Sequence, residues 1–233
     1  YNEQDNVVRT TMAVLRACER LACDFEVIIV NDGSTDRTAE LAEQLARQHP
    51  QVRVVHNWPN RGYGAALRRG FYAAVKNWVF YTDGDGQFDP GELQLLLPLL
   101  RHCQIVSAYR IRRSDPLLRR VNAWAWTMLV NLLFGMRLRD VDCAFKIFPK
   151  ALFEQIELHS NGALIDAEVL AKARLRGYRV AQVGVHHYPR LAGQQTGAKL
   201  PVVLRAFWEL FRLYGDIRLG ARSVGRRRQE AAG

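Results

Sequence analysis

The sequence predicts an α/β protein in which a mostly parallel central sheet is flanked by helices. Between residues 1 and 82, polar loops lead into helical patterns three times, and apolar runs of strand length separate these patterns. This alternation favours parallel strands joined by right-handed crossovers. The chain has 233 residues, 48% of them apolar, which is enough to bury the large core that such a fold needs.

The elements of the first part follow from hydrophobic periodicity. We expect helices at residues 7–21, 37–48 and 65–75, and strands at residues 25–30, 52–55 and 79–82. Each strand ends in a polar loop, and ligands of parallel α/β sheets bind beyond the carboxyl ends of the strands. The loops are therefore expected to share one rim of the sheet. Because residue 1 already lies in such a loop, a further strand is expected to precede it in the complete fold.

The second part of the chain has two kinds of element. Strands are expected at residues 105–109 and 180–185, and a helix carries the segment 164–170. Two further helices, at residues 119–136 and 201–219, are apolar except for a narrow polar stripe. A helix of this kind is either buried in a core or lies in a membrane interface, and both alternatives are open.

The most informative stretch is the acidic loop that follows the apolar run Val79 to Tyr81. Asp83 and Asp85 stand one residue apart, so in an extended chain their carboxylates point to the same side. Hard oxygen ligands of this kind suit Mg²⁺ or Mn²⁺, which also bind the oxygens of a diphosphate. Gly84 and Gly86 allow a ligand to approach the backbone closely. A solvated Asp-Gly turn is the alternative interpretation.

The charge distribution indicates an anionic partner. The net charge is +10, and residues 199–233 carry eight Lys and Arg against three Asp and Glu, which is half of the excess. A second basic cluster comprises Arg110, Arg112, Arg113, Arg119 and Arg120. Nucleic acid, a membrane surface and a phosphorylated substrate all fit such a balance.

The sequence gives little support for a cysteine metal site, a signal peptide or a membrane-spanning segment. The four cysteines lack C-x-x-C spacing, so a cysteine metal site is not indicated and a reduced cytosolic setting is the simplest interpretation. No secretory signal pattern is present, and no apolar run approaches the about 20 residues that span a bilayer.

Several motifs, in order along the chain, carry a family resemblance. They read Y-N-E-x-x-N at residues 1–6, V-N-D-G-S-T-D at 30–36, N-x-G-x-G-x-A at 60–66, D-G-D-G-Q at 83–87, D-x-x-C-x-F-K-x-F at 140–148 and H-x-P-R at 187–190. The set resembles the family 2 inverting glycosyltransferases, and within them the branch that makes polyprenyl- or dolichyl-phosphate sugars, such as mannose synthases. Two departures are Asn31, where the family usually has Asp, and Ala144, where it often has Gly.

The resemblance implies a nucleotide-diphospho-sugar transferase fold of the GT-A type and a division of the chain into three parts. Residues 1–200 are expected to form the catalytic domain, and residues 201–220 an amphipathic interface helix. Residues 221–233 are expected to form a disordered basic tail. Basic residues near anionic lipid add attraction on the order of 1 kcal/mol each.

The resemblance also implies which residues bind the nucleotide-sugar donor. They lie in the loops at the strand ends and are Asn2, Glu3, Asp32, Gly33, Arg61, Asp83 and Asp142. Glu3 and Asp32 are expected to accept hydrogen bonds from the base and the ribose, although Asp32 is also suited to cap the next helix. Arg61 is expected at a phosphate near a helix N-terminus, or in solvent.

Metal and catalytic roles follow from the same resemblance. Asp83, Asp85 and Gln87 are expected to bind Mg²⁺ or Mn²⁺, which neutralises the departing diphosphate. The expected catalytic residues are Asp85, Arg110, Lys146, Glu168 and Arg190. The three basic residues would contact phosphate, with a plain surface lysine as the alternative for Lys146. Glu168 is either a general base or an i,i+4 partner of Lys172.

These expectations combine into one function. A sugar from GDP-mannose or a UDP-sugar is transferred, with inversion, to a polyprenyl phosphate at the cytoplasmic face of a membrane. Attachment would be peripheral, through anionic lipid or a membrane-anchored partner subunit. Nucleic acid is not an expected partner, because no RNA-binding aromatic motif accompanies the arginines. The alternatives are a family 2 enzyme with a soluble or polymeric glycan acceptor, and a non-catalytic module that binds nucleotide sugar or nucleic acid.

Overall fold

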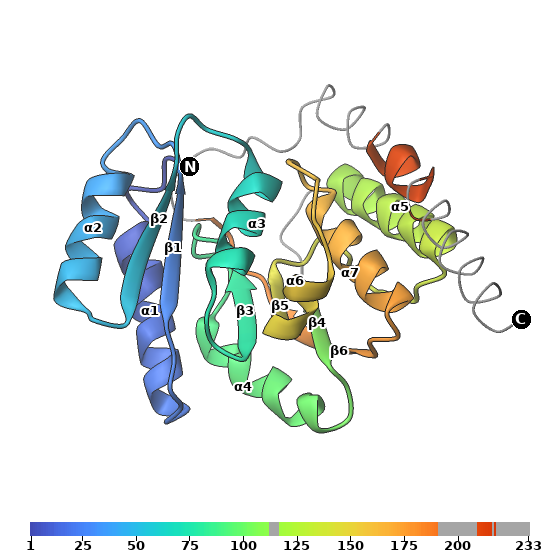
Figure 1. Ribbon diagram of the computed structural model, residues 1–233, viewed down its shortest axis with the longest axis horizontal. Helices are drawn as coiled ribbons and strands as arrows, with labels where there is room; N and C mark the ends of the chain where they lie inside the picture. The colour runs from blue at the N-terminus through green and yellow to red at the C-terminus, as the bar shows by residue number, and fades with distance from the viewer. Residues whose placement is uncertain (112–116, 191–208, 216, 218–233) are drawn as a thin grey trace, which may run out of the picture.

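The computed structural model describes residues 1–111, 117–190, 209–215 and 217. Strands occupy the middle of the molecule and helices lie on both sides of them (Figure 1). The expected α/β class, with a central sheet flanked by helices, is confirmed. Most of the expected interface helix and the whole basic tail lie outside the described residues.

The first part of the chain forms a small parallel sheet. β1 (Val27–Asp32) pairs with β2 (Val52–Asn57) in register from end to end, and α2 (Thr38–Gln48) connects them. α1 (Val7–Arg20) packs against this unit. Their shared core is built from Val7, Leu15, Ala42, Leu45 and Val52.

The central sheet has four strands in the order β3-β5-β4-β6. β3 (Trp78–Thr82), β4 (Ile105–Ile111) and β6 (Val180–His186) run in the same direction, and β5 (Phe145–Pro149) runs against them between β3 and β4. The sheet is therefore mixed, and β5 is a strand that the sequence patterns did not indicate. Within the described residues, β1 pairs with β2 and not with β3.

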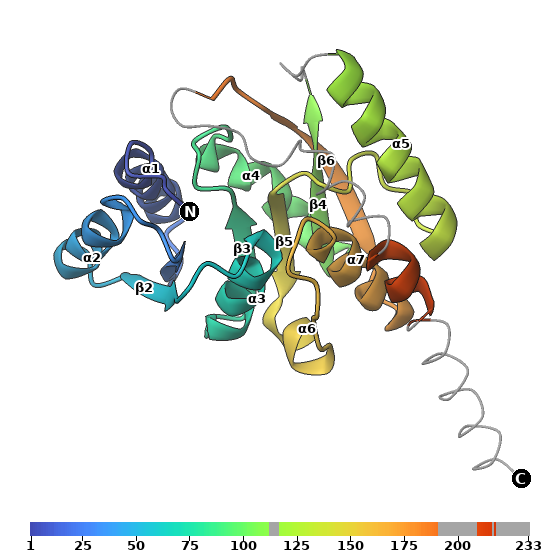
Figure 2. The same cartoon turned by 90° about the horizontal axis from the view of Figure 1, so that it is seen from above.

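Three helices cover one face of the central sheet. They are α3 (Tyr63–Ala73), α6 (Lys150–Gln155) and α7 (Ile165–Leu175), which lie together on the near side in Figure 1 and below the strands in Figure 2. Phe71 of α3 stacks on Phe153 of α6 at 4.6 Å between ring centroids. Such aromatic contacts add to the burial of a continuous core beneath these helices.

The remaining helices lie on the other side and at the end of the sheet. α4 (Leu93–Leu96), with a 3-10 turn before it (Pro90–Glu92) and after it (Leu97–Arg101), occupies the opposite face (Figure 2). α5 (Leu117–Phe134) packs one side against the large core, and a last helix at residues 209–215 adds Leu210 and Leu213 to that core.

This arrangement determines where the loops meet. Because β3 and β4 point the same way, the acidic loop after β3 and Arg110 near the end of β4 lie at the same edge of the central sheet. The loops after β1 and β2 share an edge for the same reason. The candidate site therefore lies at these strand ends.

Candidate active site

The acidic loop brings two carboxylates close together at the end of β3. Burial and the neighbouring charge of Asp85 raise the pKa of Asp83 to about 7, so the two groups repel each other when both are ionised. The Tyr63 hydroxyl is hydrogen-bonded to Asp83 and partly offsets this rise. Asp85 Oδ1 accepts a hydrogen bond of 3.0 Å from the backbone N–H of Gln87, which fixes the turn. A cation beside this pair would relieve the repulsion.

The residues of this loop fit a divalent cation. Asp83 and Asp85 offer hard oxygen ligands, and Gln87 donates its Nε2 to the Tyr188 carbonyl at 2.9 Å, which leaves the carboxamide oxygen as a further hard donor. A side chain at Gly84 would enter open space, so there is room for a ligand beside the carboxylates. Within the described residues no three His, Cys, Asp or Glu side chains gather as a metal site. The remaining ligands would therefore come from a diphosphate or water.

Arg190 joins the end of β6 to this loop. Its guanidinium pairs with Glu3 and lies 3.7 Å from Asp85 Oδ2. Glu3 also accepts a hydrogen bond of 2.7 Å from the Asn6 side chain. Two residues earlier, the Tyr188 amide donates to the Gln87 carbonyl at 2.8 Å. Glu3, Asp85, Gln87 and Arg190, which are far apart in sequence, are thus brought together.

Asp32 organises the loop after β2. Its buried carboxylate accepts hydrogen bonds from the backbone amides of Arg61 (3.1 Å) and Gly62 (2.8 Å) and from the Asn57 side chain (2.8 Å). The capping alternative for Asp32 is wrong, because Asp36 accepts the hydrogen bond from Thr38 at the start of α2. A direct contact of Asp32 with the donor stays a prediction.

The N-terminal loop and the loops after β1 and β2 meet at one rim. Asn2 bonds the loop after β1, with its amide on Ser34 Oγ (2.9 Å) and its side-chain oxygen on the Thr35 amide (2.9 Å). Gly33 has a φ of +68° and lies so close to the loop after β2 that a Cβ would come within 2.6 Å of the Asn60 nitrogen. The Arg61 side chain is exposed at this rim.

Lys146 lies inside the protein. Its ammonium is fully enclosed and contacts Asp166 (2.6 Å), the Cys143 carbonyl (2.5 Å) and the Tyr81 hydroxyl (3.0 Å). The surface-lysine alternative is therefore wrong, whereas a contact of Lys146 with phosphate stays a prediction. Sequence reasoning missed Asp166 and Tyr81. A second acid two residues before Glu168, at the start of a helix, was the available signal.

A second acidic group lies near the end of β4. Arg110 makes a bidentate ion pair with Asp140, with distances of 2.7 and 2.8 Å. Asp142 accepts a hydrogen bond of 3.1 Å from the Trp126 indole, and burial followed by the charges of Asp166 and Asp140 raises its pKa to about 7. Asp140 and Trp126 were not singled out from the sequence. Arg112 and Arg113 of the basic cluster lie outside the described residues.

The acid on α7 has a structural role. Glu168 is fully buried and accepts hydrogen bonds from the amides of His159 (3.0 Å) and Ser160 (2.8 Å) and from Lys172 (2.6 Å). Burial alone would raise its pKa, but the bonds from Lys172 and Ser160 outweigh it and lower the pKa. The i,i+4 partnership with Lys172 is confirmed. General-base action is not supported, because the carboxylate is enclosed and a weak base.

The loop held by Glu168 explains the glycines at the start of α3. The Gly64 amide donates to the Asn161 carbonyl at 2.8 Å. A Cβ at Gly64 would come within 2.6 Å of the carbonyl oxygens of Ser160 and Gly162. This amide in the first turn of α3 is therefore occupied by protein, and the phosphate site predicted near this helix N-terminus would depend on the exposed Arg61 side chain.

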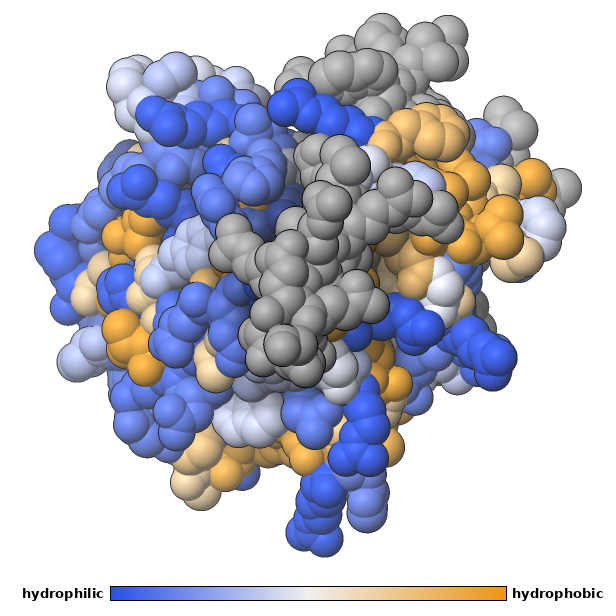
Figure 3. Space-filling model, turned by 45° about the vertical axis from the view of Figure 1, so that its right-hand side comes forward, coloured by the Kyte–Doolittle hydropathy of each residue, from blue (hydrophilic) through white to orange (hydrophobic). Residues whose placement is uncertain are grey.

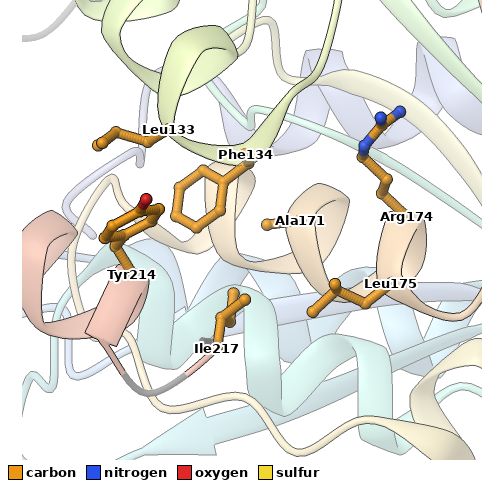
Figure 4. Close-up of a pocket in the computed structure, with 7 residues that line it drawn as sticks. All are labelled: Leu133, Phe134, Ala171, Arg174, Leu175, Tyr214 and Ile217. Carbon is orange, nitrogen blue, oxygen red and sulfur yellow. The ribbon is translucent and has the colours of Figure 1, made fainter. Parts of the chain in front are cut away.

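A small apolar pocket lies away from these loops, between α5, α7 and the last helix (Figure 4). Its volume is about 180 Å³. It is lined by Leu133, Phe134, Ala171, Arg174, Leu175, Tyr214 and Ile217. None of these is an acid or a residue of the candidate site, so the pocket is not part of it.

Known proteins are similar to this chain in sequence and in fold. The sequence model described as Glycosyl transferase family 2 matches residues 1–156. Glycosyltransferase AglD of Haloferax volcanii is 34% identical over 202 residues, which cover 82% of this chain and 32% of that protein. The dodecaprenyl-phosphate galacturonate synthase of Rhizobium johnstonii is 30% identical over 83% of this chain and 58% of its own length. The undecaprenyl-phosphate 4-deoxy-4-formamido-L-arabinose transferase of Yersinia enterocolitica is 28% identical, with 87% and 62% covered.

This chain thus spans 32% of the length of the first of these relatives and 58% to 62% of the length of the other two. Among solved structures, glucosyl-3-phosphoglycerate synthase from Mycobacterium tuberculosis, in complex with Mn²⁺, UDP-glucose and phosphoglyceric acid, is similar with a TM-score of 0.70. The match covers 92% of this chain and 76% of that one at 19% identity, so it is evidence for the fold alone.

Proposed function

Because the chain belongs to glycosyl transferase family 2, we propose that it transfers a sugar from a nucleotide sugar, GDP-mannose or a UDP-sugar, to the phosphate of a polyprenyl phosphate. The observation that carries the proposal is the coupled pair Asp83 and Asp85 at the strand ends, with Arg190 beside it. Two of the relatives are named for undecaprenyl or dodecaprenyl phosphate, which supports this class of acceptor.

The donor would lie across the rim formed by the three polar loops. Asn2, Glu3 and Gly33 are at this rim, and Asp32 fixes the loop that carries Arg61. Asp83, Asp85 and Gln87 would hold a divalent cation, Mg²⁺ or Mn²⁺, whose contribution is positive charge against the departing diphosphate. Arg190 is placed to add a second positive charge at the same point.

The acceptor would approach from the side of Arg110 and Asp142. Arg110 uses Nε and Nη2 on Asp140, and a guanidinium has further N–H donors for a phosphate. The attacking phosphate oxygen forms a bond to the anomeric carbon while the bond from that carbon to the donor diphosphate breaks. The electron pair leaves with the nucleoside diphosphate. A phosphate monoester is already an anion near neutral pH, so this step needs no general base, in agreement with the buried position of Glu168.

An apolar face on α5 supports a lipid acceptor. Its exposed side chains follow helical spacing and are Val121 (50%), Trp124 (65%), Met128 (51%) and Leu132 (81%). Figure 3 shows hydrophobic residues gathered on the side where Figure 1 places α5. We call these four residues the α5 stripe. Such a stripe can enter the apolar boundary of a membrane surface, whereas a soluble glycan acceptor gives no reason for it.

Membrane attachment would then be peripheral and on the cytoplasmic face, directly or through a membrane-anchored partner subunit. In the part of the chain that the structure describes, no helix has the length and hydropathy of a membrane-spanning segment. Arg120, at the start of α5 and exposed, is suited to contact an anionic head group.

The test is a transfer assay with a panel of nucleotide sugars, a short-chain polyprenyl phosphate and Mn²⁺ or Mg²⁺, in which products are weighed by mass spectrometry. We expect a glycosylated lipid phosphate whose formation stops with a chelator and falls at least ~100-fold in Asp85→Ala. Asp24→Ala removes an exposed aspartate paired with Lys76 and should leave transfer unchanged. Near-normal activity of Asp85→Ala would refute the metal site. Transfer to soluble glycans alone would refute the lipid acceptor, and donor binding without hydrolysis or transfer would favour a binding module.

A further inference from the structure

Among the described residues, Arg190 contacts the carboxylates of Glu3 and Asp85, and the two contacts are unequal. The contact with Glu3 is a close, direct ion pair, whereas the distance from Arg190 Nη1 to Asp85 Oδ2 is 3.7 Å. Both carboxylates and the guanidinium are mostly shielded, with side-chain exposures between 13% and 19%. Charges so shielded interact more strongly than a solvent-exposed pair. Arg190 therefore compensates the charge of Asp85, and of these two carboxylates Glu3 is the closer anchor.

The segment that carries Arg190 also holds the rest of the acidic loop. Gln87 bonds Tyr188 twice, once through its carbonyl (2.8 Å) and once through its side chain (2.9 Å). Two of the three residues predicted to bind the cation, Asp85 and Gln87, are thus tied to residues 188–190 in the arrangement seen here. The third, Asp83, is hydrogen-bonded to Tyr63.

A divalent cation and Arg190 would compete for the same carboxylate. A cation bound to Asp85 lies about 2.1 Å from its oxygen. A guanidinium nitrogen 3.7 Å from that carboxylate would then be within a few ångströms of the cation, where like charges repel strongly in a shielded site. Where the cation binds Oδ2, the oxygen that faces Arg190, neutralisation of Asp85 by both positive charges is unfavourable unless a diphosphate lies between them.

We propose that Arg190 and the divalent cation are alternative partners of Asp85, and that Arg190 turns on its Glu3 anchor from Asp85 to the donor diphosphate when the cation binds. This inference rests on the metal site in the proposed function. Arg190 is then a positioning residue before the cation and the donor bind, and a ligand of the donor diphosphate afterwards. Glu3 keeps the guanidinium at the rim during the exchange, which gives this acid a role beyond contact with the nucleotide.

One consequence is that the nucleotide-free protein has a low affinity for the cation, and that binding of the donor raises this affinity. Without a nucleoside diphosphate, the cation must displace Arg190 from Asp85 with no compensation. With the diphosphate present, Arg190 gains a new anionic partner. Cation and nucleoside diphosphate should therefore bind with positive coupling, and Arg190 should carry part of that coupling.

Arg9 offers a matched control on the other side of the loop. It carries the same charge, and its guanidinium lies against the backbone of Gly86, where a Cβ would come within 2.7 Å of Nη2. Its hydrogen bond goes to the neutral side chain of Asn6, at 3.0 Å, rather than to a carboxylate of the loop. Arg9→Gln therefore removes a nearby charge without removing a partner of Asp85.

The experiment is a Mn²⁺ titration of the whole chain followed by electron paramagnetic resonance, alone and with UDP or GDP. Without nucleotide, Arg190→Gln should bind Mn²⁺ about threefold to tenfold more tightly than wild type, as expected for the loss of a competing ion pair. Arg9→Gln should show a smaller change, and Arg190→Lys, which keeps the charge, should fall between wild type and Arg190→Gln. With nucleotide, Arg190→Gln should lose most of the coupling.

The outcomes separate this inference from the function on which it rests. Equal Mn²⁺ affinities for Arg190→Gln and Arg9→Gln would overturn the exchange at Asp85 while leaving the metal site in place. Absence of Mn²⁺ binding by wild type, with and without nucleotide, would overturn the metal site and the exchange together. Thermal unfolding of each variant shows that the comparison is made between folded proteins, and Arg190→Lys carries the test if Arg190→Gln fails to fold.

Discussion

Lys146 and Asp166 form an ion pair of 2.6 Å that is enclosed by the protein between the two acidic groups of the site. Asp83 and Asp142 both interact with this pair, and the charge of Asp166 contributes to the raised pKa of each. The Tyr81 hydroxyl is hydrogen-bonded to Asp166 as well. One buried ammonium thus lies among three carboxyl groups, so its removal should affect the stability of the whole site.

Replacement of Lys146 should mainly lower the unfolding free energy of the protein, and any loss of sugar transfer should follow from that destabilisation. Lys146→Met leaves the Asp166 side chain in a shielded position without its ion-pair partner, which typically costs about 3–5 kcal/mol. The double variant Lys146→Met/Asp166→Asn removes both charges and should recover most of that loss. Urea denaturation of the two single variants and the double variant measures this coupling. If Lys146 instead served a phosphate at the surface, Lys146→Met would lower transfer while its unfolding free energy stayed at the wild-type value.

Asp142 should make the protein less stable as the pH rises. Its pKa is about 7 in the folded protein against 3.8 for an ordinary aspartate, so the unfolded chain ionises first. The contribution to stability is complete below pH 4 and is lost as the pH rises from about 4 to 7. Asp142→Asn retains an acceptor for the Trp126 indole but cannot ionise.

We therefore expect Asp142→Asn to be more stable than wild type at pH 8 by on the order of 4 kcal/mol, since the shift from 3.8 to about 7 is roughly three pKa units and each unit corresponds to about 1.4 kcal/mol. The two proteins should be equally stable near pH 4. Urea denaturation at a series of pH values measures the difference, with Asp24→Asn as the exposed control. A constant difference between Asp142→Asn and wild type across this range would contradict the assignment.

The fold could be predicted from the sequence wherever one pattern dominated. The alternation of apolar runs and helical segments located β1, α2 and β2 to within two residues at each end. β5 was missed because Lys146 interrupts its apolar run, and nothing local indicates that the ammonium has a buried partner on α7. An ion pair between segments that are far apart in the sequence depends on the tertiary structure, so no short stretch of the sequence predicts it.

The candidate site was predicted in position but less well in detail. The motifs placed Asp83, Asp85 and Arg190 in functional loops, and the structure gathers them. Arg61 was expected at a phosphate near the N-terminus of α3, yet the Gly64 amide there donates to a protein carbonyl, and the loop at residues 160–162 packs on Gly64. Sequence can show that a small residue is needed, but it cannot show which neighbour requires it.

Glu168 should contribute to stability rather than to proton transfer. In Glu168→Gln, an amide group replaces a carboxylate that accepts hydrogen bonds from His159, Ser160 and Lys172. We expect a loss of about 2–4 kcal/mol in unfolding free energy, because buried donors lose their charged acceptor. At a temperature where the variant is folded, the transfer rate should stay within a few fold of wild type. A general base would show the reverse, with a large loss of kcat and unchanged stability.

The α5 stripe should bind a membrane surface. Trp124 and Leu132 are its most exposed members, and their replacement by Ser removes apolar area without disturbing the buried side of the helix, where Val130 lies. We expect Trp124→Ser/Leu132→Ser to reduce cosedimentation with vesicles of anionic phospholipid at least about fivefold, because each buried apolar side chain contributes roughly 1.5–3 kcal/mol at most. Transfer to a water-soluble short-chain lipid phosphate should stay within a few fold of wild type.

Val75→Ser is the matched control, because Val75 is 72% exposed but lies just beyond α3 and outside the stripe. It should leave vesicle binding unchanged. Raised salt should weaken binding of the wild type and the control alike, since the basic residues near the stripe contribute through charge. If the stripe variant and the control bound vesicles equally well, the apolar face of α5 would have to serve another contact, and the argument for a lipid acceptor would then depend on the relatives alone.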